Sequence, residues 1–111
     1  MTDVKRVSGV IRTKPEKADR YKELHANAWP EINAMIKACN IRNYSIYFKD
    51  GYLFSYFEYV GEDFDADMAK MAADPKTQEW WDECIPCLEP LETRAPHEDV
   101  WAEMEEVYHL D

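Results

Sequence analysis

The 111-residue sequence contains only three glycines, and no part of it approaches the run of about 18 apolar residues that a membrane-spanning helix needs. It has no Gly-rich loop that could cradle a phosphate, no H-E-x-x-H motif and no Ser-His-Asp order typical of hydrolases. The opening MTDVKR is not followed by an apolar run, so no secretory signal peptide is expected. These absences argue against phosphate-binding, membrane-spanning and common hydrolase classes.

Basic residues are also scarce. Thirteen lysines and arginines face 23 aspartates and glutamates, which gives a formal net charge of −10. Phosphate backbones and anionic bilayers require a basic surface. We therefore expect no nucleic-acid partner and no membrane partner, and a ligand that is neutral or cationic.

The cysteines are three in number, an odd count that fits a reducing cytoplasm when no signal peptide is present. Cys84 and Cys87 form a C-x-x-C pair, but they follow a predicted helix, whereas a redox pair should open a helix whose N-terminus lowers the first thiol's pKa. Cys39, His97 and His109 lack the spacing of zinc ligands. Neither a redox centre nor a metal site is expected.

The N-terminal third predicts a strand followed by a long helix. Residues 6–12, RVSGVIR, alternate as a short strand does, and a helix is expected from about Pro15 to Cys39. Its apolar stripe, at helical spacing, consists of Ala18, Tyr21, His25, Trp29, Ile32 and Ile36. Pro30 cannot donate to the carbonyl of Ala26, so the helix should kink or restart there.

The rest of the chain begins with a hairpin. In residues 43–60, Asp50-Gly51 separates two runs of aromatic and β-branched residues, which is a strong hairpin signal. Downstream, the pattern predicts a helix that Asp74-Pro75 ends, a short helix over residues 76–85, a loop over residues 86–99 and a last strand in MEEVYHLD, residues 104–111.

This order of elements, β-α-β-β-α-β, predicts an α+β fold: a ferredoxin-like βαββαβ antiparallel sheet with helices on one face, in a single domain over residues 1–111. The other face of such a sheet must also be covered. A second copy of so short a chain is the expected cover, which predicts a homodimer and a dimeric α+β barrel.

Two aromatic groups are candidates for chemistry. His25 lies one helical turn after Tyr21 and one before Trp29, so rings flank an imidazole that titrates near neutrality. A lone histidine on an apolar stripe can equally be a structural residue. Trp80 and Trp81 point about 100° apart on a helix, which suits either a sugar-stacking platform or one core and one interface residue.

Five motifs occur together in this sequence: Tyr21-x-x-x-His25, Trp29-Pro30-Glu31, Asn43-Tyr44-x-Ile46-Tyr47, Trp80-Trp81 and Glu106-Val107-Tyr108. With them the chain, from about Arg6 to Leu110, resembles the L-rhamnose mutarotase family, whose members are small dimeric ferredoxin-like proteins. The resemblance implies a single mutarotase domain, an isomerase that interconverts the α and β anomers of L-rhamnose or a related 6-deoxy aldose by acid/base-catalysed ring opening.

The resemblance also implies roles for particular residues. The histidine matching His25 is the proton donor, and the residues matching Tyr21, Tyr44, Trp80 and Trp81 contact the sugar. No metal or organic cofactor is implied. Several alternatives stay open: a mutarotase for L-fucose or another aldose, a non-catalytic dimeric α+β module that binds a small ligand, and, as partner base of the reaction, either Glu31 or a bound water.

Overall fold

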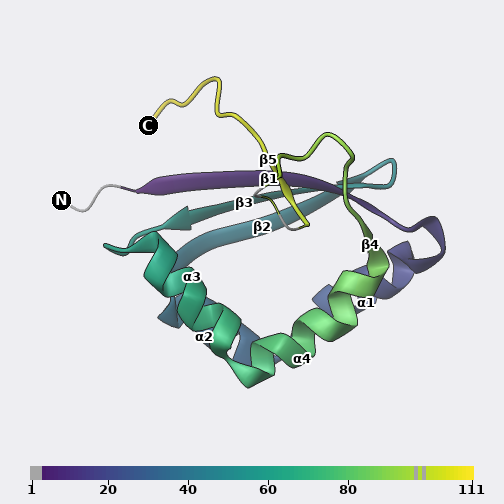
Figure 1. Ribbon diagram of the computed structural model, residues 1–111, viewed down its shortest axis with the longest axis horizontal. Helices are drawn as coiled ribbons and strands as arrows, with labels where there is room; N and C mark the ends of the chain where they lie inside the picture. The colour runs from purple at the N-terminus through teal and green to yellow at the C-terminus, as the bar shows by residue number, and fades with distance from the viewer. Residues whose placement is uncertain (1–3, 97, 99) are drawn as a thin grey trace.

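A computed structural model describes residues 4–96, 98 and 100–111, and it contains one antiparallel sheet with its helices on one side (Figure 1). The strands are β1 (Lys5–Thr13), β2 (Ile41–Lys49), β3 (Tyr52–Tyr59), β4 (Leu88–Glu89) and β5 (Ala102–Glu103). The order is β2-β3-β1-β4, with β5 also paired to β1. The predicted ferredoxin-like α+β fold is confirmed.

The short strands β4 and β5 share one edge of β1. β4 pairs with Arg12 and Thr13 at the end of β1, whereas β5 pairs with Gly9 and Val10 nearer its middle. The chain leaves the sheet after Glu89 and pairs with it again at Ala102. The edge that a single last strand would occupy is therefore built from two pieces.

The predicted long helix is divided, as Pro30 suggested. A 3-10 turn η1 (Pro15–Lys17) precedes α1 (Ala18–Ala26), and α2 (Pro30–Ala38) follows after a short gap. Asn27 leaves the helical region of backbone space, and Pro30 is the first residue of α2, where its missing N–H costs no hydrogen bond. The prolyl ring starts a new helix instead of kinking the old one.

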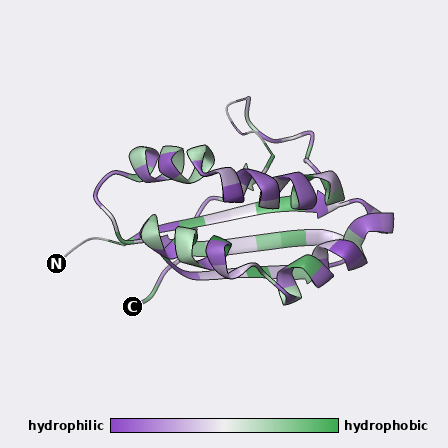
Figure 2. Cartoon of the chain, turned by 90° about the horizontal axis from the view of Figure 1, so that it is seen from below, coloured by the Kyte–Doolittle hydropathy of each residue, from purple (hydrophilic) through white to green (hydrophobic). Residues whose placement is uncertain are grey.

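The second helical region matches its prediction. It comprises α3 (Phe64–Ala73), α4 (Pro75–Cys84) and the 3-10 turn η2 (Ile85–Cys87). The side chains of Asp63 and Asp74 cap α3 and α4 by accepting hydrogen bonds from the backbone N–H groups of Ala66 and Thr77. Figure 2 shows the four helices over the sheet in two rows, α3–α4 and α2–α1. Among the described residues, none of the helices has the length and apolar character needed to cross a bilayer.

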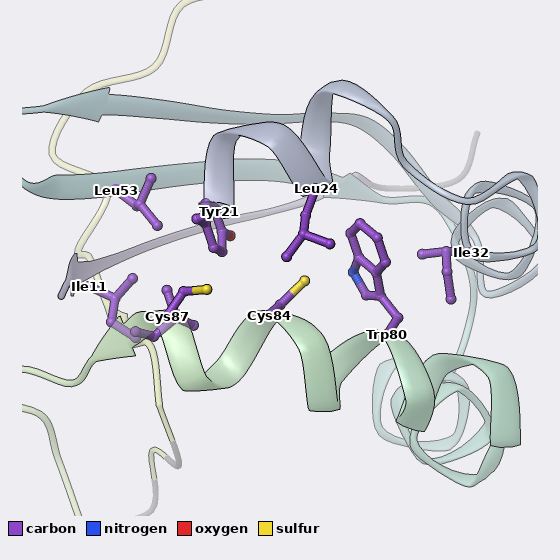
Figure 3. Close-up of a cluster of buried hydrophobic side chains, with 9 residues drawn as sticks. Ile11, Tyr21, Leu24, Ile32, Leu53, Trp80, Cys84 and Cys87 are labelled. Carbon is purple, nitrogen blue, oxygen red and sulfur yellow. The ribbon is translucent and has the colours of Figure 1, made fainter. Parts of the chain in front are cut away.

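The predicted hairpin is confirmed, and its register determines which side chains face the helices. Asp50 and Gly51 have φ of 53° and 83°, the pair of positive values that a two-residue type I′ turn requires. Ile11 pairs with Leu53, and both belong to the core between sheet and helices (Figure 3). The other buried members of this core are Tyr21, Leu24, Ile32, Trp80, Cys84, Cys87 and Leu88.

The predicted last strand over residues 104–111 is wrong. The strand that closes the sheet is β5, before this segment, and residues 104–111 have no regular structure. Met104 N–H still donates to the Ser8 carbonyl at 2.8 Å, after which the chain departs from β1 and leaves Val107, Tyr108 and Leu110 exposed. Alternating residues favour an extended chain, but a strand exists only where a neighbouring backbone pairs with it.

Candidate active site

Helix α1 stacks Tyr21 and His25 on each other, one turn apart. Their ring centroids are 4.1 Å apart, with an interplanar angle of 26°. The Nδ1 atom of His25 lies 2.9 Å from the carbonyl oxygen of Tyr21. A carbonyl can only accept a hydrogen bond, so Nδ1 carries the proton and donates it. In the neutral ring the lone pair is therefore on Nε2, the atom that can take up a proton.

Helix α4 closes the other side of the imidazole with a second aromatic ring. Trp80 is buried, and its centroid lies 5.2 Å from that of His25 in an edge-on arrangement. Trp29, in the gap between α1 and α2, lies 5.2 Å from Trp80 in the same manner. The imidazole thus contacts Tyr21 of its own helix and Trp80 of α4, and Trp29 packs behind Trp80.

Burial sets the protonation states of this cluster. It lowers the pKa of His25, although the backbone hydrogen bond to Tyr21 works in the opposite direction. Burial also raises the pKa of Tyr21, with a smaller contribution from the neighbouring Tyr44. Near pH 7 the imidazole is therefore neutral and the phenol protonated. Neither Nε2 nor the Tyr21 hydroxyl hydrogen-bonds to a described residue, and neither is sealed from solvent.

Tyr44 approaches the cluster from the sheet. It lies in β2 with its ring 5.4 Å from that of Phe57. Although 42% of the residue's surface is exposed, burial together with the nearby Cys84 raises the pKa of Tyr44 to about 12. The Tyr44 phenol therefore lies near enough to the buried Cys84 and Tyr21 to interact with them electrostatically, while 42% of the residue meets solvent.

Trp81 is separated from its neighbour, as adjacent helical residues must be. It is half-buried and packs at the margin of the core, whereas Trp80 contacts the imidazole. The structure therefore gathers Tyr21, His25 and Trp80 directly, brings Tyr44 alongside them, and leaves Trp81 at the periphery.

Comparison with known proteins identifies the family to which the chain belongs. The family model described as L-rhamnose mutarotase matches residues 6–110. The chain belongs to the L-rhamnose mutarotase family. It is 31% identical over 110 residues to the L-rhamnose mutarotase of Oceanobacillus iheyensis and 30% identical over 110 residues to that of Bacillus subtilis; each match covers 97% of this chain and 100% of the relative.

Solved structures agree on the fold. The crystal structure of an L-rhamnose mutarotase from Formosa agariphila superposes with a TM-score of 0.73 at 24% identity, covering 96% of this chain and 99% of the other. The tetracenomycin F2 cyclase of Streptomyces glaucescens superposes with a TM-score of 0.69 at 14% identity, covering 96% and 97%. At these identities the likeness concerns the fold alone.

Two hollows border the aromatic cluster of this family member. One, of about 180 Å³, has Tyr44, Phe57 and Trp101 in its wall. The other, of about 290 Å³, lies beside Leu24 and Trp29. His25 lines neither of them, and its half-buried ring reaches solvent between the helices. Sequence reasoning missed Trp101, because a single tryptophan beyond a predicted loop carries no periodic signal.

The cysteines do not form a reactive centre. All three are free and buried, and burial raises the pKa of Cys84 to about 12, with Cys87 adding to the effect. A thiol that stays protonated is a poor nucleophile, which argues against the redox alternative. Among the described residues, which do not include His97, no group of three or more His, Cys, Asp or Glu side chains is placed to hold a metal ion.

Proposed function

We propose that this member of the L-rhamnose mutarotase family interconverts the α and β anomers of L-rhamnose, or of a related 6-deoxy aldose, with His25 as its catalytic residue. One observation carries this proposal. The hydrogen bond from Nδ1 to the Tyr21 carbonyl leaves an unpartnered, solvent-accessible Nε2 between two aromatic rings. The proposed unit is the single domain over residues 1–111.

The chemistry needs one group that gives and retakes a proton. Nε2 takes the proton of the anomeric hydroxyl, the bond between C1 and the ring oxygen breaks, and C1 becomes an aldehyde. The imidazolium returns its proton to the ring oxygen, so no proton is gained or lost. Rotation about the C1–C2 bond and the reverse steps close the ring as the other anomer. Positioned acid–base groups typically contribute about 10²–10⁴-fold to a rate, and this sequence of transfers requires no metal.

The residues around His25 suit a sugar. Tyr21 stays protonated and can donate a hydrogen bond to a sugar oxygen, and the buried Trp80 offers an apolar face. Tyr44 and Trp81 complete the proposed substrate-binding set from β2 and the far side of α4. Because His25 both takes and returns the proton in these steps, they need neither a bound water nor Glu31, which is exposed and lies 3.7 Å from Lys76 Nζ, as a partner base.

Saturation-transfer NMR on L-rhamnose tests the activity directly. The wild-type protein should accelerate anomer exchange above buffer, and His25→Ala should slow that exchange by about 10²–10⁴-fold. His109→Ala, which changes an exposed histidine in the C-terminal segment, is the matched control and should keep full activity. The same assay repeated with L-fucose and a panel of D-aldoses ranks the substrates. Quenching of tryptophan fluorescence by these sugars with no faster exchange would instead establish the non-catalytic binding module.

A homodimer is the assembly we propose, in the reducing cytoplasm that free cysteines favour. The bare face of the sheet presents Tyr47, 66% exposed, and Tyr52, 38% exposed. The tail beyond β5 adds Val107, Tyr108 and Leu110, all more than three-quarters exposed. An aromatic sheet face next to an apolar tail is unusual for a monomer and suits a second copy of the same chain.

A further inference from the structure

The hollow of about 180 Å³ lies on the helix side of the sheet, between the paired strands β1 and β3 and the segment that leads into β5. Apolar groups make up most of its wall, and the ones used below are Gly9, Tyr44, Phe57 and Trp101. Pockets for drug-sized ligands usually measure about 300–1,000 Å³. This hollow is therefore of a size for a small ligand or for part of one.

Gly9 in β1 lies at the bottom of the hollow, close to Ser55, Ala102 and Trp101. A Cβ atom at Gly9 would lie 3.3 Å from the carbonyl oxygen of Ala102 and 3.4 Å from Cε3 of Trp101. The contact with the Ala102 carbonyl, and one of 3.2 Å with Ser55 Oγ, are tighter than is usual for a side-chain carbon, and the contact with Trp101 lies at the edge of the ordinary range. The missing side chain therefore lets β5 and Ser55 lie close to β1, and the Trp101 indole beside Gly9 packs on the margin of the core and forms one wall of the hollow.

Ser55 gives the apolar hollow a polar group with no partner. The residue is only 9% exposed, yet its Oγ makes no hydrogen bond to any described residue, and the atom is not sealed from solvent. Since Ser55 lines the hollow, that hydroxyl opens into it. Water can reach this hydroxyl in the free protein, and a ligand hydroxyl that enters the hollow can replace that water as its hydrogen-bond partner.

We propose that Trp101 and Ser55 are further substrate-binding residues, with the indole stacking on a C–H face of the sugar and the Ser55 hydroxyl bonding to one sugar hydroxyl. An apolar ring beside one hydrogen-bonding group is the chemistry by which proteins hold monosaccharides. Tyr44 is the residue that this subsite shares with the proposed sugar-binding set around His25, because it lines the hollow together with Phe57, against whose ring it packs. The inference rests on the proposed mutarotase function and adds two residues to that site.

KM for anomer exchange tests the proposal. Trp101→Ala should raise KM by about tenfold or more and Ser55→Ala by about two- to tenfold, both with little change in kcat, because these contacts bind ground state and transition state alike. Trp101→Phe should fall between Trp101→Ala and wild type. Thr93→Ala removes an exposed hydroxyl from the loop outside the hollow and should leave KM unchanged. KM does not depend on how much of the protein is active, so partial unfolding cannot imitate this result.

Monodeoxy analogues of L-rhamnose sharpen the test for Ser55. The wild type should bind the analogue that lacks the hydroxyl bonded to Ser55 about two- to tenfold more weakly than L-rhamnose. Ser55→Ala should bind that analogue and L-rhamnose equally well, because this variant cannot form the hydrogen bond with either sugar. Wild-type exchange with unchanged KM in both Trp101→Ala and Ser55→Ala would overturn this inference and leave the proposed function intact. No exchange by the wild type would overturn the proposed function itself.

Discussion

The two faces of the sheet differ although their strands alternate in the same way. Along β3, Leu53 and Ser55 face the helices and are 2% and 9% exposed, while Tyr52 on the opposite face is 38% exposed. Tyr47 in β2, on that same bare face, is 66% exposed. Both faces carry aromatic side chains, but only one of them is covered within the chain.

The comparison shows that apolar character alone does not distinguish a core from an interface. The covered face holds the core, the His25 cluster and the hollow beside Trp101, and α1 and α4 contribute to that core. The bare face has the same kind of side chains and no helix. The proposed homodimer would cover its aromatic residues.

The largest difference between the faces should appear in stability. Leu53→Ala leaves a cavity in the core and should lower the free energy of unfolding by about 2–5 kcal/mol. Tyr52→Ala, at the preceding residue, should change it by no more than about 0.5 kcal/mol in dilute protein, where the bare face meets only water. Urea denaturation at low protein concentration measures both. Equal losses would mean that the two faces are not distinct in the monomer.

The second largest effect is expected on dimer assembly, when a charge is placed on the bare face. Tyr47→Glu would bury an unpaired carboxylate at the proposed interface, so the dimer should dissociate at least about tenfold more readily, a cost of about 1.4 kcal/mol. Phe48→Glu is the matched control, because the adjacent side chain points to the other face and lies beneath the Lys22 ammonium. Sedimentation equilibrium distinguishes the two. A wild-type protein that stays monomeric at high concentration would contradict the proposed dimer.

The pH profile of catalysis sharpens the picture of the covered face. Burial lowers the pKa of His25, and the neutral imidazole is the form that accepts the first proton. kcat/KM should therefore stay level as the pH falls through 6.5, the value of an unperturbed imidazole, and should decrease only below it. An inflection at or above 6.5 in the NMR exchange assay would show that the ring is not desolvated. The His109→Ala control should have the wild-type profile.

The smallest effect concerns stability and the same histidine. Because the folded-state pKa of His25 is lowered, the unfolded chain binds more protons between that pKa and 6.5, and the free energy of unfolding increases with pH in this window. The wild type should therefore lose slightly more stability than His25→Gln between pH 7.5 and pH 5. Urea midpoints at the two pH values measure this. An identical loss in both proteins would show that His25 does not contribute to the loss of folding stability at acid pH.

Local chemistry explains the elements that could be predicted. Asp50-Gly51 supplies the two positive φ values of the hairpin turn, and Pro30 and Pro75 each begin a helix. Such signals act within a few residues, so they can be read without knowing the fold. The strand predicted for the C-terminal tail is wrong for a related reason. Residues 104–111 alternate like a strand, but strand pairing depends on a neighbouring backbone that local sequence does not specify.

The residues of the candidate site also fall into two groups, those that local sequence predicts and those that only the fold brings together. Tyr21 and His25 share one helix, so helical spacing alone predicts their contact, and the tautomer follows from a carbonyl four residues away. Trp80 reaches them only because α4 packs beside α1. Trp101 and Ser55 come together with no sequence signal, through a loop that returns to β1 at the position where Gly9 has no side chain.

By itself, the sequence determined the order of elements, the turns and caps between them, the stacked pair on α1 and, through its motifs, the family. Only the tertiary structure decided which sheet face is covered, which tryptophan meets the imidazole and where the last strand pairs. The physical reason is the distance along the chain over which each effect acts. Backbone conformation and helical spacing act over a few residues, whereas burial, pKa and strand pairing depend on segments that are distant in sequence and meet only when the chain is folded.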